Sequence, residues 1–222
     1  SERIEATEPD FVLVQGDTTS ALAGAIASRF HSRMLGPLEA GLRTFNSESP
    51  WPEELNRRLI TQLASFHFAP TEENKQNLIG EGVSEEDIYV TGNTSVDMTM
   101  RAIERYGLAA GASQALKPKI LGTLHRRESH GEPRRQALVN LLAFLERRPE
   151  FVANVVGHPN PSVVEDLAVS RVGQHPQVSL REPLPHMELL RLLSESALVI
   201  SDSGGIQEEA PSFRVPVFIA RD

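Results

Sequence analysis

Short apolar runs alternate with amphipathic segments along most of the chain. The first run is Phe-Val-Leu-Val at residues 11–14, and an Ala-rich segment follows at 21–30. Continuous apolar runs of this length are typical of strands buried on both faces of a parallel sheet. The segments between the runs have the length and the polar face of helices. The pattern therefore predicts an α/β fold built from repeated strand–helix units.

The alternation continues to the end of the chain, with one interruption. Further strands are predicted at 34–38, 66–69, 88–92, 119–124, 151–156, 178–180, 197–200 and within the last eight residues. Helices are predicted at about 52–63, 71–80, 93–106, 134–147, 161–169 and 187–193. Residues 107–118 are rich in Ala, Gly and Ser and break the pattern. We therefore divide the chain into two parallel-sheet domains, residues 1–112 and 113–222.

Composition narrows the class of protein. The 222 residues have a formal net charge of -8, which argues against a nucleic-acid partner because such a surface needs a basic face. The absence of cysteine excludes disulfides and thiol nucleophiles and fits a cytoplasmic location. No apolar run is long enough to span a membrane, and the histidines lack zinc-type spacing. We expect neither a membrane contact nor a bound metal.

Ser203, Gly204 and Gly205 lie where a predicted strand turns directly into a helix. Free N–H groups at a helix N-terminus, glycines and the helix dipole together favour an anion such as phosphate. Glu209 follows one helical turn later on the same face, where it suits the hydroxyls of a ribose. The turn predicts a nucleotide site, although a plain strand–helix turn with acidic residues near the dipole would have the same sequence.

Three acidic residues stand near predicted strand or helix ends within the first part of the chain. Asp17 and Glu39 each follow a strand, on the edge where open α/β sheets bind ligands, and Glu53 opens a helix. Carboxylates that share a pocket can serve as acid and base. Each also has a structural explanation: an N-cap at Asp17 or Thr18, a solvated loop at Glu39, and the helix dipole at Glu53.

Histidines also follow strands in the second half. His125 stands beside Arg126 and Arg127, which together suit a phosphate because Arg offers paired donors and His a proton near neutral pH. A basic loop on an acidic protein is the alternative. His158 follows the next strand, whereas His67 alternates with phenylalanines and is predicted to be a core histidine.

Taken together, these stretches resemble the non-hydrolysing UDP-N-acetylglucosamine 2-epimerase family. They occur in the order of that family and cover nearly the whole chain. The matching pieces are QGDTT (15–19), EAGLRT (39–44), PWPEELNR (50–57), FAPTE (68–72), TGNT (91–94), LHRRE (124–128), HPNP (158–161) and SDSGGIQEEAPS (201–212).

The resemblance implies a fold and a reaction. It implies two Rossmann-like domains of the GT-B type with a UDP-sugar in the cleft between them, both domains being incomplete here. The implied enzyme interconverts UDP-GlcNAc and UDP-ManNAc by eliminating UDP to a 2-acetamidoglucal and adding it back. It needs no cofactor and supplies ManNAc for cell-envelope polysaccharide. Base and acid are both required, because the C2 proton leaves one face and returns to the other.

Residue roles follow from the matched motifs only. The resemblance assigns acid/base chemistry to Asp17, Glu39, Glu53 and His125. It assigns UDP binding to Ser203, Gly204, Gly205 and Glu209, with Arg181 and His186 where the family contacts uracil. It places Arg126 and His158 at the neighbouring regulatory UDP-GlcNAc site that some bacterial members have.

The chain departs from the family at both ends. It has no counterpart of the opening Gly-Thr-Arg-Pro-Glu turn, and it lacks the later Thr-Glu-Arg-Pro-Glu turn with the closing helices. We therefore expect an internal fragment or a split-gene product, homodimeric if complete. Two alternatives stay open: a non-catalytic remnant that still binds UDP-sugar, and a hydrolysing UDP-GlcNAc 2-epimerase or related GT-B glycosyltransferase.

Overall fold

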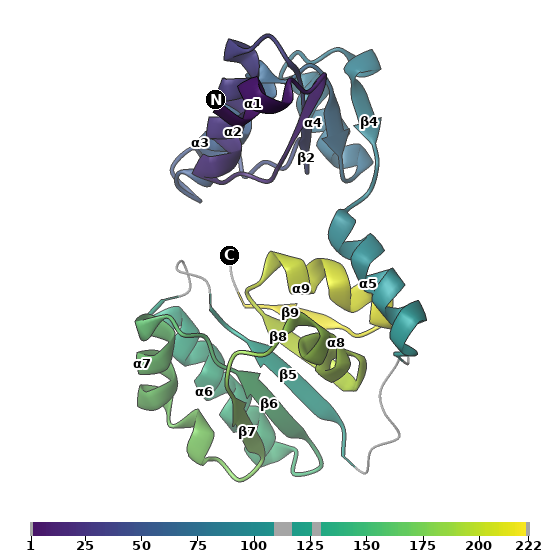
Figure 1. Cartoon of the computed structure of the whole chain (residues 1–222). Coiled ribbons are helices and arrows are strands. Elements are labelled where there is room, and N and C mark those ends of the chain that lie inside the picture. The colour runs from purple at the N-terminus through teal and green to yellow at the C-terminus, as the bar shows by residue number, and fades with distance from the viewer. Residues whose placement is uncertain (1, 109–116, 126–129, 221–222) are drawn as a thin grey trace. The chain divides into compact units, whose positions relative to one another are not determined.

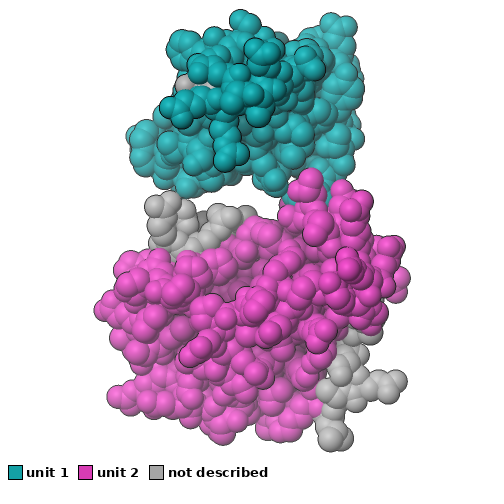
Figure 2. Space-filling view, in the orientation of Figure 1, with its two compact units in different colours: residues 1–93 teal, residues 94–222 magenta. Residues whose placement is uncertain are grey.

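The computed structural model describes residues 2–108, 117–125 and 130–220. The chain forms two compact units, residues 1–93 and 94–222 (Figure 1, Figure 2). Each unit has its own sheet and its own core, and each is described by itself below.

The described part of the first unit contains a four-stranded parallel sheet in the order β1-β2-β3-β4. Its strands are β1 (Phe11–Gln15), β2 (Met34–Leu38), β3 (His67–Ala69) and β4 (Ile88–Val90). Its helices are α1 (Glu2–Thr7), α2 (Thr19–Phe30), α3 (Glu53–Leu63) and α4 (Glu72–Gly80), with a short 3-10 turn at Glu85–Asp87.

The described part of the second unit contains a five-stranded parallel sheet in the order β7-β6-β5-β8-β9. Its strands are β5 (Lys119–Thr123), β6 (Val152–Val156), β7 (Val178–Arg181), β8 (Ser196–Ser201) and β9 (Val217–Ile219). Its helices are α5 (Thr94–Tyr106), α6 (Glu132–Arg147), α7 (Pro161–Ser170), α8 (His186–Ser194) and α9 (Gly204–Glu209), with 3-10 turns at Val172–Gln174 and Ala210–Phe213. The predicted α/β architecture with parallel sheets is confirmed.

The continuous apolar run of β5 is explained by packing on both sheet faces. Ile120 and Leu121 are both fully buried, yet they belong to different core clusters. Ile120 packs in the cluster that contains Leu138 of α6, and Leu121 packs in the cluster that contains Leu190 of α8. Because neighbouring residues of a strand point to opposite faces, a strand covered on both faces must be apolar throughout.

The compact units divide the chain before α5, whereas the sequence pattern placed that helix in the first domain. Ala102 of α5 is buried in the same cluster as Leu121 and Phe213 of the second unit. The apolar stripe of an amphipathic helix shows that it packs on a sheet but not on which one. The assignment of 1–112 and 113–222 as the domains stays a prediction.

His67 is a core histidine, as its alternation with phenylalanines predicted. Only 3% of the residue is exposed, and its Nε2 lies 3.3 Å from the carbonyl oxygen of Thr61. Burial lowers the pKa of the His67 ring below its ordinary value, because the charged form loses hydration. The folded chain therefore favours the neutral ring.

A fully buried ion pair joins α6 to α7. Arg134 Nη1 donates to Asp166 Oδ2 at 2.8 Å, and neither side chain is exposed. The same carboxylate accepts the Gly131 N–H at 3.1 Å, and Arg135 and His130 each have a nitrogen 3.4 Å from it. Asp166 thus contacts donor groups both just before α6 and within its first turn. Gly131 has φ +80°, a conformation that glycine adopts without strain.

We predict that Asp166→Ala lowers the free energy of unfolding by about 3 to 5 kcal/mol, because it removes one half of the fully buried ion pair with Arg134. Urea unfolding followed by circular dichroism measures this change. Glu165→Ala, at the exposed neighbouring position, is the control and should change stability by less than about 0.5 kcal/mol. Equal losses in the two variants would contradict the role of Asp166.

A second prediction concerns acid stability through His67. Its pKa is lower in the folded chain than the ordinary value of 6.5. Its contribution to stability is therefore full above about pH 6.5 and is lost as pH falls through the folded pKa. His67→Gln should flatten the decrease in unfolding free energy between about pH 7.5 and 5. Identical slopes for the His67→Gln variant and the unchanged chain would refute the prediction.

Candidate functional site

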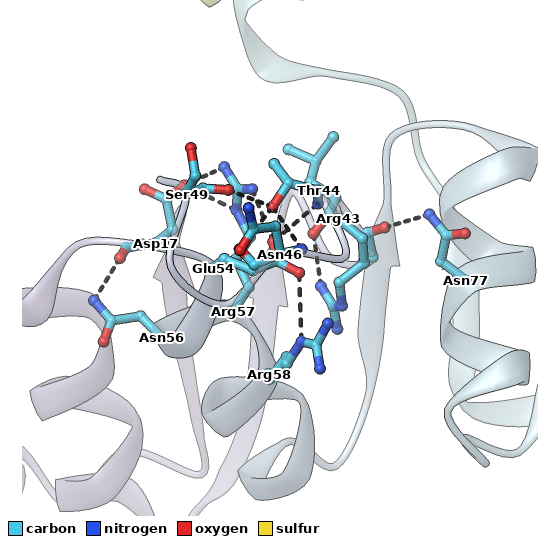
Figure 3. A network of polar contacts seen from close by, with 12 residues as sticks. Asp17, Arg43, Thr44, Asn46, Ser49, Glu54, Asn56, Arg57, Arg58 and Asn77 are labelled. Atoms are coloured by element: carbon cyan, nitrogen blue, oxygen red, sulfur yellow. Dashed lines mark hydrogen bonds and ion pairs between the residues drawn. The ribbon is translucent and has the colours of Figure 1, made fainter. Parts of the chain in front are cut away.

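Asp17 is the centre of a polar network at the carboxyl end of β1 (Figure 3). Arg57 of α3 donates to Asp17 Oδ2 from Nη2 at 2.6 Å and from Nε at 3.0 Å. Asn56 donates from its side-chain amide to the Asp17 carbonyl oxygen at 2.7 Å. Thr18, not Asp17, caps α2, because its hydroxyl accepts the Ala21 N–H at 3.1 Å. Asp17 is therefore held by α3, and the N-cap explanation for it falls away.

Glu54 extends this network into the loop after β2 (Figure 3). Its side chain is fully buried, and Oε2 accepts the Thr44 N–H at 3.1 Å and Arg57 Nη1 at 3.2 Å. Arg58 Nε lies 3.4 Å from Oε1, a pair with the i,i+4 spacing at which helix side chains meet. Burial raises the pKa of the Glu54 carboxyl, but the Thr44 N–H and Arg57 outweigh it and hold the pKa below its ordinary value.

The loop that carries Glu39 is fastened to α4. The Gly41 carbonyl oxygen accepts the Asn77 side-chain amide at 3.0 Å, and Gly41 has φ +83°. A Cβ at this position would lie 2.2 Å from the Asn74 carbonyl oxygen, so only glycine fits. Arg43 binds the Glu81 carboxylate through Nε at 2.6 Å and Nη2 at 2.7 Å. Such paired contacts hold the loop in one position.

Glu39, like Asp17, lies at the carboxyl ends of the strands of this sheet. Strands β1 and β2 run parallel with Gln15 opposite Leu38, so the residues after them are neighbours. The Gln15 amide donates to Glu39 Oε1 at 3.0 Å. Glu39 has φ +63°, a left-handed conformation that is uncommon outside glycine. Strain of this kind occurs most often at functional sites.

Glu53 and the start of α3 reach the same edge. Glu53 is the first residue of α3 and directly precedes Glu54. Since Glu54 contacts the loop at Thr44 and Asn56 contacts Asp17, the first turn of α3 lies beside both strand ends. The structure thus brings the three acidic residues that the sequence singled out in this unit to one edge of its sheet.

Sequence reasoning missed Arg57 and Asn56 as members of this site. Arg57 entered the sequence analysis only as part of a motif, whereas its guanidinium binds Asp17, 40 residues away in the sequence. No periodicity predicts a pair that far apart. The available signal was the position of both residues inside the stretch PWPEELNR at 50–57.

In the second unit, His125 follows β5 and Asp202 follows the adjacent β8. Thr123 and Ser201 lie opposite each other in these strands, and their hydroxyl oxygens are 2.7 Å apart. The Asp202 side chain is fully buried, and Oδ1 accepts the His125 N–H at 2.9 Å. Asp202 in turn donates its own N–H to the Thr123 carbonyl oxygen at 3.2 Å. These bonds hold the backbone of His125 at the end of β5, and the sequence analysis did not identify Asp202.

His158 follows β6, on the other side of β5, and stacks on His125. The two rings are 5.4 Å apart between centroids and inclined by 16°. The Asn160 N–H donates to His158 Nδ1 at 3.2 Å, which leaves Nε2 as the outer nitrogen of the ring. His125 of the predicted basic cluster thus contacts His158, while Arg126 and Arg127 lie outside the described residues.

The Ser203-Gly204-Gly205 turn lies beside Asp202 at the end of β8. Ser203 is the N-cap of α9, and its N–H donates to Ser201 Oγ at 3.0 Å. The first N–H groups of a helix have no acceptor within the helix, and the two glycines present no side chain to an approaching group. Glu209 ends α9, and its Oε1 lies 2.8 Å from Nε2 of His186, the first residue of α8.

Arg181 ends β7 and reaches the same edge of the sheet. Its Nε donates to the Asn154 side-chain oxygen at 3.2 Å. A cavity of about 560 Å³ opens here against α7, and both His158 and Arg181 contribute to its wall. His158, His125, Asp202 and Arg181 thus stand at the carboxyl ends of four adjacent strands, where open α/β sheets bind their ligands.

The described residues contain no group of three or more His, Cys, Asp or Glu side chains arranged to hold a metal ion. None of their helices combines the length and the apolar character needed to cross a bilayer.

Comparison with known proteins identifies the family. A family model described as UDP-N-acetylglucosamine 2-epimerase matches residues 1–222. The UDP-N-acetylglucosamine 2-epimerase of Neisseria meningitidis has 40% sequence identity to this chain over an alignment that covers 99% of it. The enzyme of Bacillus subtilis has 39% identity over the whole chain. The crystal structure of the Neisseria meningitidis enzyme bound to UDP-GlcNAc superposes with a TM-score of 0.92, and an S. aureus MnaA–UDP structure at 35% identity superposes with 0.89.

The chain spans about three fifths of these relatives, namely 61% of the Neisseria sequence, 58% of the Bacillus sequence, and 62% and 60% of the two solved chains. Within that span, each unit has the α/β fold that the resemblance implied. The chain belongs to the UDP-N-acetylglucosamine 2-epimerase family.

Proposed function

We propose that this chain is the central part of a non-hydrolysing epimerase that interconverts UDP-GlcNAc and UDP-ManNAc. One observation carries the proposal. At the carboxyl ends of the strands of the second sheet, His125 and the Ser203-Gly204-Gly205 turn both lie beside the buried Asp202. The similar structures from Neisseria meningitidis and S. aureus contain UDP-GlcNAc and UDP. A nucleoside diphosphate suits a glycine-containing helix N-terminus beside histidines.

In this proposal the turn binds the diphosphate and Glu209 accepts hydrogen bonds from the ribose hydroxyls. Arg181 contacts the uracil. The resemblance places His186 there as well, and in this structure its side chain lies against Glu209. The net charge of -8 disfavours an anionic ligand at long range. Binding therefore depends on local groups, namely the helix dipole and the paired rings of His125 and His158.

The proposed reaction is an elimination followed by an addition. A base removes the C2 proton of the sugar while the C1–O bond breaks and UDP leaves with the bonding electrons. UDP then adds back to C1 of the 2-acetamidoglucal, and an acid returns a proton to the opposite face of C2. Asp17, Glu39 and Glu53 of the first unit and His125 of the second are the proposed acid/base set.

The network around Asp17 suits such chemistry. Arg57 binds one oxygen of the Asp17 carboxylate, so the other oxygen keeps its capacity to accept a proton or a hydrogen bond. A side chain held in one orientation contributes more to proton transfer than a mobile one, because its geometry is set before the substrate reacts.

We further propose a regulatory site, an oligomeric state and a location for the whole protein. His158 with Arg126 forms the regulatory UDP-GlcNAc site, and the stack of His158 on His125 would couple its ligand to the acid/base set. We also propose a homodimer and a cytoplasmic location, the latter because a cysteine-free chain suits a reducing compartment.

The first test is product analysis with the purified 222-residue chain and UDP-GlcNAc. We expect UDP binding by calorimetry and formation of UDP-ManNAc, detected by NMR of the sugar. Free ManNAc together with UDP would indicate the hydrolysing reaction instead. Binding without turnover would indicate a remnant that needs the remaining two fifths of the family fold.

A second prediction isolates His125. In an active full-length form, His125→Ala should lower kcat by at least about a hundredfold, because a general acid or base contributes that much or more. UDP affinity should fall less than kcat, since the turn, Glu209 and the His158 ring are unchanged and only one ring of the stacked pair is lost. The matched control is His175→Ala, which lies outside the site and should retain normal turnover. Normal turnover in the His125→Ala variant would exclude the proposed role.

A further inference from the structure

The contact between His186 and Glu209 has a defined direction. Glu209 ends α9 with 9% of its side chain exposed, and its Oε1 lies 2.8 Å from His186 Nε2. An ionised carboxylate only accepts hydrogen bonds, so the imidazole Nε2 must carry the proton and donate it. A charge-assisted bond of this length is among the stronger hydrogen bonds of a protein. The bond therefore restrains the Glu209 carboxylate in one orientation.

The bond with His186 uses only one oxygen of the Glu209 carboxylate, so the other oxygen can bind a ligand. The last torsion of a glutamate side chain is broad, so the donor at Oε1 decides where Oε2 points. A carboxylate offers about four lone-pair sites, which leaves acceptor capacity at Oε2 after the histidine is bound. The vicinal 2′ and 3′ hydroxyls of a ribose are two adjacent donors that suit a carboxylate held in this way.

The backbone of His186 is held by contacts other than this bond. Leu190 and Leu193 of α8 are fully buried in the core cluster that also contains Ile206 of α9. Pro185 precedes the helix and restricts the backbone at its start. The His186 side chain itself is 54% exposed. Substitution at His186 therefore changes the contact with Glu209 without removing a part of the core.

We propose that His186 is a positioning residue that makes the site selective for nucleotides with an intact ribose diol, by fixing the carboxylate of Glu209. The inference rests on the proposed function and deepens it, because it names the part of the nucleotide that the pair selects. It also differs from a contact between His186 and uracil. Loss of a uracil contact would weaken ribo- and deoxyribonucleotides alike. Loss of carboxylate orientation would weaken ribonucleotides more, because a 2′-deoxynucleotide offers the carboxylate only its 3′ hydroxyl.

The experiment measures the dissociation constants of UDP and 2′-deoxy-UDP by calorimetry for the unchanged chain and four single variants. His186→Phe keeps a ring but has no donor, and His186→Gln keeps an N–H donor. Glu209→Gln removes the carboxylate. Glu188→Gln, at an exposed position in the same first turn of α8, is the control.

We expect the unchanged chain to prefer UDP, and Glu209→Gln to abolish that preference. His186→Phe should reduce the preference about tenfold, the factor expected for a hydrogen bond to a charged group. His186→Gln should retain most of it, and Glu188→Gln all of it. In the Glu209→Gln background, His186→Phe should leave the ratio of the two constants unchanged, because both act through one carboxylate.

Two results would overturn the inference in different ways. Equal weakening of both nucleotides by His186→Phe would reject the positioning role while leaving the proposed function intact, provided that Glu209→Gln still abolishes the preference. Failure of the unchanged chain to bind UDP would reject the proposed function and the inference together.

Discussion

The parallel pairing of β5 with β8 is the constraint on which the second unit depends. It sets Thr123 opposite Ser201, so the next residues, Leu124 and Asp202, leave the sheet side by side. Asp202 then binds the His125 N–H from a fully buried position. A buried carboxyl group that lacks hydrogen-bond partners is costly, so the His125 N–H helps to keep the Asp202 side chain in the core. The same bond locates His125 beside the Ser203 turn.

In the first unit, a helix and not a neighbouring strand holds the candidate residue in place. Arg57 joins the Asp17 carboxylate, at the end of β1, to the buried Glu54 of α3. Glu54 in turn receives the Thr44 N–H from the loop after β2. One guanidinium with a fixed fork of donors can bridge two carboxylates, which a lysine could not do with the same geometry. Asp17 and Glu54 are thus held by one local cation in a protein of net negative charge.

These arrangements agree with the proposed reaction. An elimination that removes a proton from carbon needs carboxylates and histidines held in place, and a leaving diphosphate needs donors at a helix end. In both units the candidate groups stand on the carboxyl edge of a parallel sheet. The restraint of Glu209 by His186 extends the same principle to nucleotide recognition, since a side chain fixed before binding costs less to order.

The sequence by itself determined the α/β class, the succession of strands and helices along the chain, and the family, because apolar runs and short motifs are local signals. It also identified which strand ends carry acidic residues and histidines. Tertiary structure alone decided that Arg57 binds Asp17, that Asp202 holds His125, and that α5 packs in the second unit. Residues 17 and 57 or 125 and 202 meet only because sheet register and helix packing bring distant segments together, and no spacing in the chain records such a contact.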